Sequence, residues 1–366
     1  MKKIAIIGTN GLPGRYGGWD QLMEHITKLL SSKYLFFVYC TTHNVKARLK
    51  KYNNSELVYI PLRANGWQSV FYDIFASIHA LFNANTIILL GGAGTIMFPI
   101  FKLFRIEVIY HPDGIEWKRQ KWSKAVQLYL KWLERIGIFW CDKIISDNIE
   151  ITKYLINSYK KDSYLIEYGA DHVLSTTLSI EIKKFYKIER GNYAFKVCRI
   201  EPENNLDLIL DSFKNSKVRL IVVGNWNNSI YGIKLRKSYS GFDNMSLLDP
   251  IYNQEKLDEL RSNCGIYIHG HSVGGTNPSL VEAMYLGLNV VAFDVSFNRA
   301  TTENSALYFR NVNDLKSLMT TFYNNNAIFD STGQTLRKIA YSRYLWREII
   351  LKYDQMISSV NYTCSE

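Results

Sequence analysis

The stretch Gly270–Met284 combines glycines, small polar side chains and one carboxylate, a set suited to binding a phosphate or a sugar. A short apolar run, Gly265–Ile268, precedes it and predicts a buried strand, and Pro278 opens a predicted helix that carries Glu282. A helix N-terminus presents unpaired N–H groups and the positive end of a dipole, which attract anions. Adjacent glycines let a ligand approach the backbone closely. Glycines alone equally fit an ordinary strand-to-helix turn, but together with a carboxylate that can bond a ribose diol they favour a nucleotide-sugar site.

The same stretch resembles the donor-binding motif of the family 4 glycosyltransferases, in which a glycine-containing turn leads into a Glu-Ala-Met helix. Other parts of the chain are similar to a bacterial branch of that family that includes rhamnosyltransferases of surface-polysaccharide assembly. These blocks are Gly8–Trp19, Asp113–Arg119, Arg199–Asn205 and Phe293–Arg299. The resemblance implies a GT-B architecture, in which two Rossmann-like doubly wound domains face a cleft and a C-terminal helix crosses back to the first domain. It also implies transfer of a sugar from a nucleoside diphosphate with retention of the anomeric configuration.

The order of apolar and helical patterns predicts an α/β fold. A chain of 366 residues exceeds what one core usually fills, and strand-like runs alternate with helical patterns in both halves, which is typical of parallel sheets. A first helix is predicted over Asp20–Leu30, with Asp20 near its N-cap. The predicted strands are Ile4–Ile7, Phe36–Cys40, Leu57–Ile60, Thr86–Leu90, Glu107–Tyr110, Lys143–Ser146, Ser163–Ile166, Phe195–Cys198, Arg219–Val223, Met245–Leu248, Ile266–His269, Val290–Phe293 and Ala306–Tyr308.

A polar, charged stretch around residues 175–190 separates the two halves and is interpreted as the interdomain linker. We expect an N-terminal acceptor-side domain over residues 1–175 and a C-terminal domain that binds the donor over residues 190–343. Residues 344–366 would form the helix that returns to the first domain.

Three polar side chains are predicted to act in catalysis. His111 and Asp113 follow the predicted strand Glu107–Tyr110, so they would lie at the carboxyl end of a sheet, where α/β proteins bind ligands. Asp113 would orient the acceptor hydroxyl or stabilise a positively charged transition state, whereas a structural hydrogen bond explains His111 equally well. Arg199 matches the arginine that binds the donor diphosphate in the resembling family, a role that suits its bidentate geometry.

The residues predicted to hold the donor come from two glycine-containing loops. They are Arg15, Gly17 and Gly18 in the first loop, and His271, Gly274, Gly275, Thr276, Asn277 and Glu282 in and after the second. Two positions depart from the wider family. Asn204 and Asn205 stand where a phosphate-binding lysine is usual, so Lys234 or Arg236 would have to supply a second cation. Gly274 replaces the first carboxylate of a Glu-x7-Glu pair, so backbone N–H groups and small polar side chains would recognise the sugar.

The formal net charge is +11, and cations cluster beside aromatic residues. One cluster comprises Trp117, Lys118, Arg119, Lys121, Trp122 and Lys124, and another comprises Phe98, Phe101, Lys102, Phe104 and Arg105. Such clusters suit an anionic membrane surface, although a solvated face has the same composition. The sequence shows neither a secretory signal nor a membrane span. We expect a cytoplasmic protein that is peripheral at the inner face of the cell membrane and transfers a sugar to a lipid-linked saccharide. Rhamnose is the first candidate for this sugar.

Two other classes of function remain open. Gly8, Gly11 and Gly14 fit the fingerprint of an NAD-dependent oxidoreductase, but Pro13 interrupts it and the second predicted strand ends without an acidic residue to hold a ribose. A non-catalytic basic protein would bind nucleic acid or anionic lipid, yet it has no need of an internal phosphate pocket. We therefore expect no nucleic-acid partner. The scattered cysteines have no metal-ligand spacing, and neither a metal nor a further cofactor is expected.

Overall fold

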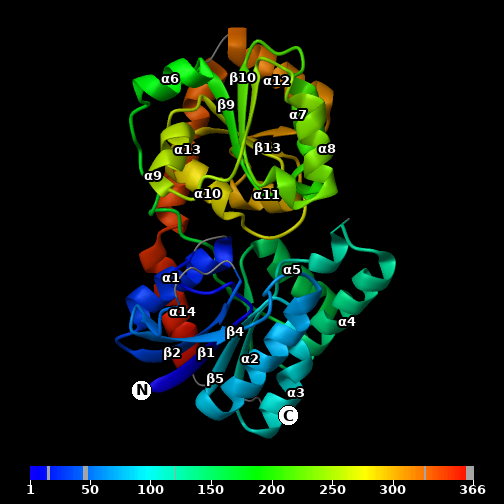
Figure 1. Ribbon diagram of the computed structural model, residues 1–366, viewed down its shortest axis with the longest axis vertical. Coiled ribbons are helices and arrows are strands. Elements are labelled where there is room, and N and C mark those ends of the chain that lie inside the picture. Colours follow the sequence, from blue (N-terminus) through cyan, green and yellow to red (C-terminus); the bar gives the residue numbers. More distant parts are fainter. Residues whose placement is uncertain (15–16, 44–47, 120, 325–326, 360–366) are drawn as a thin grey trace. The chain divides into compact units, whose positions relative to one another are not determined.

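The chain forms two compact units in a computed structural model that describes residues 1–14, 17–43, 48–119, 121–324 and 327–359. The first unit joins Met1–Glu167 to the C-terminal segment Trp346–Glu366, and the second unit is Tyr168–Leu345. Each unit is built on its own sheet, with helices between successive strands (Figure 1).

The first unit contains an eight-stranded sheet. Its strands are β1 (Lys2–Ile7), β2 (Tyr34–Thr41), β3 (Lys51–Tyr52), β4 (Ser55–Ile60), β5 (Thr86–Leu90), β6 (Glu107–His111), β7 (Lys143–Ser146) and β8 (Tyr164–Leu165). They lie in the order β3-β4-β2-β1-β5-β6-β7-β8, and the paired strands are parallel except for the antiparallel pair β3–β4. The central strand β5 is buried throughout, so its sequence is a continuous apolar run rather than an alternating one.

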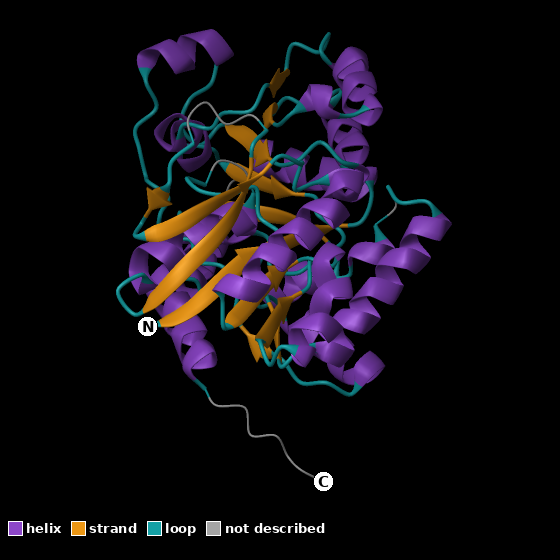
Figure 2. Cartoon of the chain, turned by 60° about the horizontal axis from the view of Figure 1, so that its bottom comes forward, coloured by secondary structure: helices purple, strands orange, loops and turns teal. Residues whose placement is uncertain are grey.

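Helices cover this sheet, as Figure 2 shows in purple beside the orange strands. They are α1 (Gly18–Leu30), η1 (Gly66–Gln68), α2 (Ser69–Asn83), η2 (Ala93–Met97), α3 (Phe98–Leu103), η3 (Glu116–Lys118), α4 (Lys124–Trp140), α5 (Ile149–Tyr159) and α14 (Trp346–Ser358), where η denotes a 3-10 helix. α1 buries Leu22, Ile26 and Leu30 on one face, the spacing expected of an amphipathic helix.

The C-terminal helix α14 belongs to the first unit, which confirms the predicted return of the chain. In Figure 1 this helix, drawn in red, lies beside α1, and the ring of His25 on α1 stacks on Trp346 with 4.0 Å between the ring centroids.

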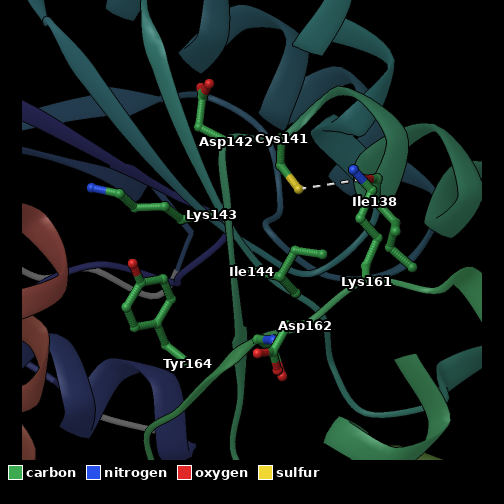
Figure 3. A pocket seen from close by; sticks show the side chains of 9 residues that line it. Ile138, Cys141, Asp142, Lys143, Ile144, Lys161, Asp162 and Tyr164 are labelled. Carbon is green, nitrogen blue, oxygen red and sulfur yellow. Dashed lines mark hydrogen bonds between the residues drawn. The ribbon is translucent and has the colours of Figure 1, made fainter. Parts of the chain in front are cut away.

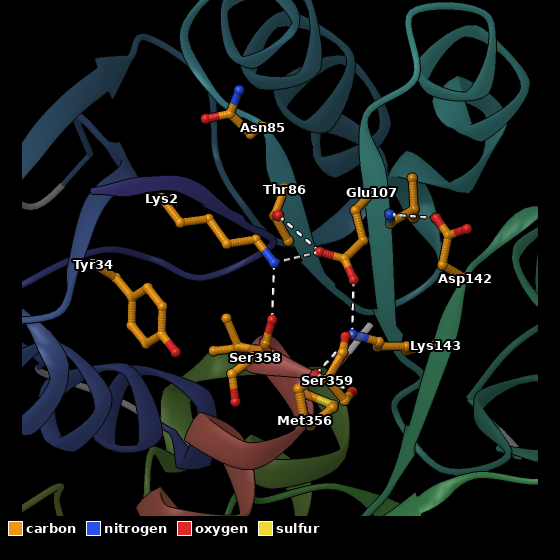
Figure 4. Close-up of polar contacts among 12 residues, drawn as sticks. Lys2, Tyr34, Asn85, Thr86, Glu107, Asp142, Lys143, Met356, Ser358 and Ser359 are labelled. Carbon is orange, nitrogen blue, oxygen red and sulfur yellow. Dashed lines mark hydrogen bonds and ion pairs between the residues drawn. The ribbon is translucent and has the colours of Figure 1, made fainter. Parts of the chain in front are cut away.

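Two lysines of the sheet fix the end of α14 (Figure 4). Lys2 Nζ donates to the carbonyl oxygen of Ile357 at 2.8 Å, and Lys143 Nζ donates to that of Met356 at 2.7 Å. The carboxylate of Glu107 pairs with both ammonium groups, at 2.6 and 2.8 Å. Burial alone would raise the pKa of Glu107, but the two lysines lower it below its usual range. Cations are favourable at the negative end of a helix dipole, so this cluster stabilises α14 against the sheet.

The second unit contains a six-stranded sheet. Its strands are β9 (Tyr193–Val197), β10 (Arg219–Val223), β11 (Met245–Leu248), β12 (Ile266–His269), β13 (Asn289–Phe293) and β14 (Leu307–Phe309). They are parallel and lie in the order β11-β10-β9-β12-β13-β14. The chain adds β10 and β11 on one side of β9 and then returns to add β12 on the other. This reversal between β9 and β12 is the switch point at which doubly wound sheets bind ligands, beyond the carboxyl ends of the strands.

The helices of the second unit pack around this sheet. They are α6 (Ile180–Tyr186), η4 (Pro202–Asn204), α7 (Leu206–Phe213), η5 (Trp226–Asn228), α8 (Ile230–Tyr239), α9 (Gln254–Ser262), α10 (Pro278–Tyr285), α11 (Ser296–Thr301), α12 (Val312–Asn324) and α13 (Ala327–Arg343). Trp226 is fully buried in a core that it shares with Ile209, Phe213 and Met319, and its Nε1 donates to the carbonyl oxygen of Leu248 at 2.9 Å.

The predicted α/β class with two Rossmann-like sheets is confirmed, and every predicted strand overlaps an observed one. The prediction missed β3, a short edge strand without an apolar run. Asp20 lies in the first turn of α1, near the N-cap as predicted, but the N-cap residue is Gly17, which provides no side-chain cap. The carboxylate of Asp20 instead accepts a hydrogen bond from the backbone N–H of Asn10 at 3.0 Å.

The interpretation of residues 175–190 as a linker was also wrong. This stretch is part of the second unit and contains α6. The backbone N–H of Ser179 donates to Glu259 on α9 at 2.7 Å, and that of Thr176 donates to Ser262 at 3.2 Å. Polar side chains here satisfy the backbone of a packed segment, which composition alone does not distinguish from a solvated linker.

Candidate functional site

The carboxyl ends of β9 and β12 bring two of the predicted blocks together. β9 is followed by Arg199–Asn205, and β12 is followed by the loop Gly270–Asn277 that leads into α10. The two loops touch, because Asn205 Nδ2 donates to the carbonyl oxygen of Gly270 at 2.7 Å. The predicted diphosphate arginine and the glycine-rich turn therefore lie at one switch point.

Arg199 presents an available cation at this point. Its side chain is exposed and forms no hydrogen bond or ion pair with any residue in the described ranges. Its backbone carbonyl accepts a hydrogen bond from Nδ2 of Asn204 at 2.9 Å, and Asn204 is buried. Asn204, which stands where the resembling family has a lysine, thus holds the loop that carries Arg199.

The glycine-rich turn ends in a capped helix. Asn277 is the N-cap of α10, and its Oδ1 accepts hydrogen bonds from the N–H of Ser279 at 3.1 Å and from the hydroxyl of Ser279 at 2.8 Å. Gly274 has a φ of 138°, and a Cβ placed there would lie 2.9 Å from Nε2 of His271. A glutamate at this position would therefore strain the backbone and crowd His271. The missing carboxylate is consistent with the local geometry of the turn.

The other predicted residues of the turn are largely enclosed. Thr276 and His271 are buried, whereas Gly275 is half-buried. The carbonyl oxygen of His271 accepts a hydrogen bond from Asn298 Nδ2 at 2.9 Å, which anchors the turn to α11. The ring of His269 at the end of β12 lies 6.2 Å from that of His271.

Glu282 is embedded in a charged network on α10. Its Oε2 accepts a hydrogen bond from Nη1 of Arg261, and its Oε1 lies 3.1 Å from Nε2 of His172. Arg261 is fully buried and also pairs with Asp258, three residues earlier on α9. Burial alone would raise the pKa of Glu282, but Arg261 and His172 beside it lower that pKa to about 2. Glu282 is therefore a charged carboxylate whose two oxygens are already bonded.

This network was missed by sequence reasoning. α9 reads as a strongly polar helix, so Asp258 and Arg261 look like a solvent-exposed i,i+3 pair. Their burial depends on α9 packing beside the sheet, which no local pattern reveals. His172 lies outside any recognised motif, and nothing in its sequence context indicates a partner more than a hundred positions away.

His111 ends β6 in the first unit, where it was predicted. It is buried, and its Nδ1 lies 3.4 Å from the hydroxyl of Tyr353 on α14. Its Nε2 has no hydrogen-bond partner among the described residues. Burial lowers the pKa of His111 to about 4, although the charge of Asp113 opposes this effect. The imidazole is therefore neutral near pH 7, with one ring nitrogen oriented by the returning helix.

Asp113 is held by a buried partner. Nη2 of Arg119 donates to its Oδ2 at 2.8 Å, and the side chain of Arg119 is 4% exposed whereas that of Asp113 is 35% exposed. Arg119 was expected to face a membrane, and that expectation was wrong because its guanidinium is enclosed. Asp113 keeps an accessible carboxylate in an orientation that Arg119 fixes.

The first glycine loop leads into α1. Gly17 precedes this helix with a φ of 100°, a conformation that favours glycine, and Gly18 is its first residue. The Gly14 N–H donates to Oε2 of Glu24 at 2.9 Å, which ties the loop to α1. Arg15, predicted to contact the donor, lies outside the described residues.

A cavity of about 480 Å³ lies elsewhere in the first unit (Figure 3). It is lined by Ile138, Cys141, Asp142, Lys143, Ile144, Lys161, Asp162, Ser163 and Tyr164. These residues surround the beginnings of β7 and β8. His111 and Asp113 lie instead at the carboxyl ends of the strands of this parallel sheet. Over the described ranges, no group of three or more His, Cys, Asp and Glu side chains is arranged to hold a metal.

Comparisons with known proteins agree with this division of the chain. Residues 179–339 match the model of the family described as glycosyl transferases group 1. The matched residues lie within the second unit. Residues 1–171 match a domain of unknown function, DUF1972, and a comparison with curated proteins finds no match.

Solved structures place the whole chain in the GT-B fold. Sucrose-phosphate synthase from Thermosynechococcus elongatus is 14% identical with a TM-score of 0.82, and the match covers 98% of both chains. Anabaena HepE, solved in complex with UDP-glucose, is 13% identical with a TM-score of 0.78 over 98% of this chain and 100% of that one. WaaG, a glycosyltransferase involved in lipopolysaccharide biosynthesis, is 12% identical with a TM-score of 0.73 over the same shares. Family and fold together support a glycosyltransferase and do not favour an oxidoreductase.

Proposed function

We propose that the protein is a metal-independent, retaining glycosyltransferase that moves a sugar from a nucleoside diphosphate sugar to a lipid-linked saccharide. Rhamnose is the first candidate for the sugar. The observation that carries the proposal is the available guanidinium of Arg199 beside the glycine-rich turn and α10, at the switch point of a group 1 glycosyltransferase domain. The structure of HepE in complex with UDP-glucose supports a nucleotide sugar as the donor.

The donor half of the reaction is assigned to the second unit. As the glycosidic bond breaks, negative charge grows on the departing nucleoside diphosphate. Arg199 and the N-terminus of α10 would stabilise that charge, and such stabilisation acts mainly in the transition state. Glu282 would bind the ribose hydroxyls by exchanging its contact with His172, while Arg261 keeps its carboxylate charged.

The acceptor half is assigned to the carboxyl end of β6 in the first unit. Neutral His111 would orient the acceptor hydroxyl through Nε2, because a group with a pKa of about 4 carries little positive charge near pH 7. The half-exposed carboxylate of Asp113 would stabilise positive charge that develops on the transferred sugar.

A membrane location is supported by an exposed apolar face on α2, α3 and α4, which adjoin η2 or one another (Figure 1). On these helices the acidic side chains Asp73 and Glu134 are buried, whereas Lys124, Lys131 and Arg135 are exposed. Exposed apolar side chains together with exposed cations suit an anionic bilayer. The exposed apolar side chains include Phe71, Phe75, Ile78 and Phe82 on α2, Leu103 on α3, and Leu128, Trp132 and Phe139 on α4.

Two aromatic residues of the second aromatic-basic cluster expected from the sequence, Phe98 and Phe101, belong instead to the core. No helix in the described part of the chain is long and apolar enough to span a bilayer. We propose peripheral binding at the cytoplasmic face of the membrane, where lipid-linked saccharides are extended.

A transfer assay tests the proposed function. The protein is incubated with radiolabelled UDP-, dTDP- or GDP-sugars and a polyprenyl diphosphate-linked saccharide in anionic vesicles. We expect label from one donor to enter the lipid phase, with the anomeric configuration of the donor preserved in the product. An absence of transfer from every donor, together with oxidation of NADH, would favour the oxidoreductase instead.

A further inference from the structure

Lys196 is a buried lysine inside the second sheet. Among the described residues of the second unit it is the only lysine that is buried, with an exposed fraction of 1%. It forms no hydrogen bond or ion pair with any of these residues. An ammonium group that is removed from water without a partner is costly, so an unpaired buried lysine calls for an explanation.

The position of Lys196 in the sheet provides one. It precedes the last residue of β9 and lies three residues before Arg199. The parallel register pairs Ala194 with Ile266 and Phe195 with Tyr267, so Lys196 comes level with Ile268 near the end of β12. Lys196 therefore lies near the carboxyl ends of β9 and β12, the two strands between which the switch point lies. Its flexible four-carbon stem can carry the ammonium group past the strand end.

The electrostatic surroundings of Lys196 agree with this placement. Burial lowers its pKa from the ordinary value. Burial is also the main reason that the pKa of His269 is low, and the positive charges of Lys196 and His271 lower it further. Nε2 of His269 is buried and has no hydrogen-bond partner within the described ranges. The strand ends therefore hold an unpaired cation and an unpaired ring nitrogen, groups that an anion would satisfy.

Two other cations of the second unit already have carboxylate partners. Arg261 is paired with Asp258 and Glu282. Arg236, one of the two side chains expected to supply a second cation, stands in the last turn of α8 and pairs with Asp249. At Asn204 the usual lysine is absent.

We propose that Lys196 is the second cation for the donor diphosphate, acting with Arg199 in place of the lysine missing at Asn204. The inference rests on the proposed function and names a binding residue for its donor. The ligand is a nucleoside diphosphate, whose second phosphate would pair with the Lys196 ammonium. A lysine on β9 then replaces the lysine that the wider family has in the following loop, and Asn204 holds that loop through the carbonyl of Arg199.

The test compares Lys196→Met with the matched control Lys237→Met, which alters an exposed lysine on α8. Isothermal titration uses UDP, dTDP and GDP and the corresponding monophosphates. We expect Lys196→Met to weaken the preferred diphosphate about ten- to a hundredfold and the monophosphate less, as loss of a charge-assisted contact predicts. Lys237→Met should match the wild type. Lys196→Arg, which keeps the charge, should recover part of the loss.

Two results separate the inference from the function on which it rests. If the folded Lys196→Met protein binds the diphosphate within twofold of the wild type, Lys196 is not the second cation although the donor site stands. If the wild-type protein binds no diphosphate, the proposed function itself fails. Should Lys196→Met not fold, Lys196→Gln provides the same comparison, and full affinity in that variant overturns the inference.

Discussion

The buried network around Glu282 makes a sharp prediction for Arg261→Met. Arg261 is fully buried between the carboxylates of Asp258 and Glu282, so its loss leaves two buried anions without their cation. Breaking a buried pair from one side typically costs about 3–5 kcal/mol. The fall in the pKa of Glu282 from 4.5 to about 2 corresponds to about 3 kcal/mol, which is of the same order.

The dependence on pH follows from the direction of that pKa. A carboxylate whose pKa is lower in the folded chain than in the unfolded chain stabilises the fold above the unfolded value and loses this contribution as the pH falls. For Glu282 the wild type keeps the contribution above about pH 4.5 and loses it toward pH 2. In Arg261→Met the unpaired carboxylate is protonated more easily. The difference in stability between the two proteins should therefore shrink as the pH is lowered from 7 to 5.

Urea unfolding followed by circular dichroism at pH 7 and pH 5 measures this difference. The control is Arg236→Met, which breaks the exposed pair with Asp249 and should cost at most about 1 kcal/mol. Glu282→Gln added to Arg261→Met should recover part of the loss, because it removes one unpaired charge. If Arg261→Met costs no more than Arg236→Met at pH 7, the network does not hold Glu282 as described.

Two further substitutions test separate parts of the account. Asn204→Lys restores the residue type of the wider family, but it removes the bond from Asn204 to the carbonyl of Arg199. We expect it to lower the unfolding free energy by about 1–3 kcal/mol in urea titrations without tightening diphosphate binding, and tighter binding would contradict the structural role of Asn204. Phe75→Ser with Phe82→Ser removes two side chains that are 55% and 76% exposed, and should reduce co-sedimentation with anionic vesicles. The matched change Phe185→Ser, at a 78% exposed position of the second unit, should leave co-sedimentation unchanged; equal losses would mean that α2 is not the binding face.

The strands could be predicted from the sequence because buried parallel strands are continuous apolar runs. β5, β7, β10, β11 and β12 have the predicted bounds. The edge strand β3 lacks such a run and was missed. Asp20 lies near the N-cap of α1 as predicted, but it does not cap the helix because its carboxylate accepts a hydrogen bond from the N–H of Asn10 in the preceding loop.

The residues of the candidate site likewise fall into those that could be predicted from the sequence and those that could not. Arg199, the glycine-rich turn and Glu282 could be predicted because each belongs to a motif whose residues are close together in the sequence. Arg119, Arg261 and His172 were misjudged or missed because their roles depend on partners that only the fold brings near. A charged residue in a polar helix looks the same whether it faces water or a buried carboxylate. The packing of the helix decides which of these two surroundings the residue has, and the neighbouring residues in the sequence do not reveal that packing.

The second unit is proposed to bind a nucleoside diphosphate sugar through Arg199. Calorimetric titration of UDP-, dTDP- and GDP-sugars into the wild type, Arg199→Ala and the control Arg190→Ala tests it most directly. We predict that the wild type and Arg190→Ala bind one donor equally. Arg199→Ala should bind it at least about tenfold more weakly, because a charge-assisted phosphate contact is lost. Equal binding by all three proteins, or binding of NADH and of no sugar nucleotide, would contradict the account.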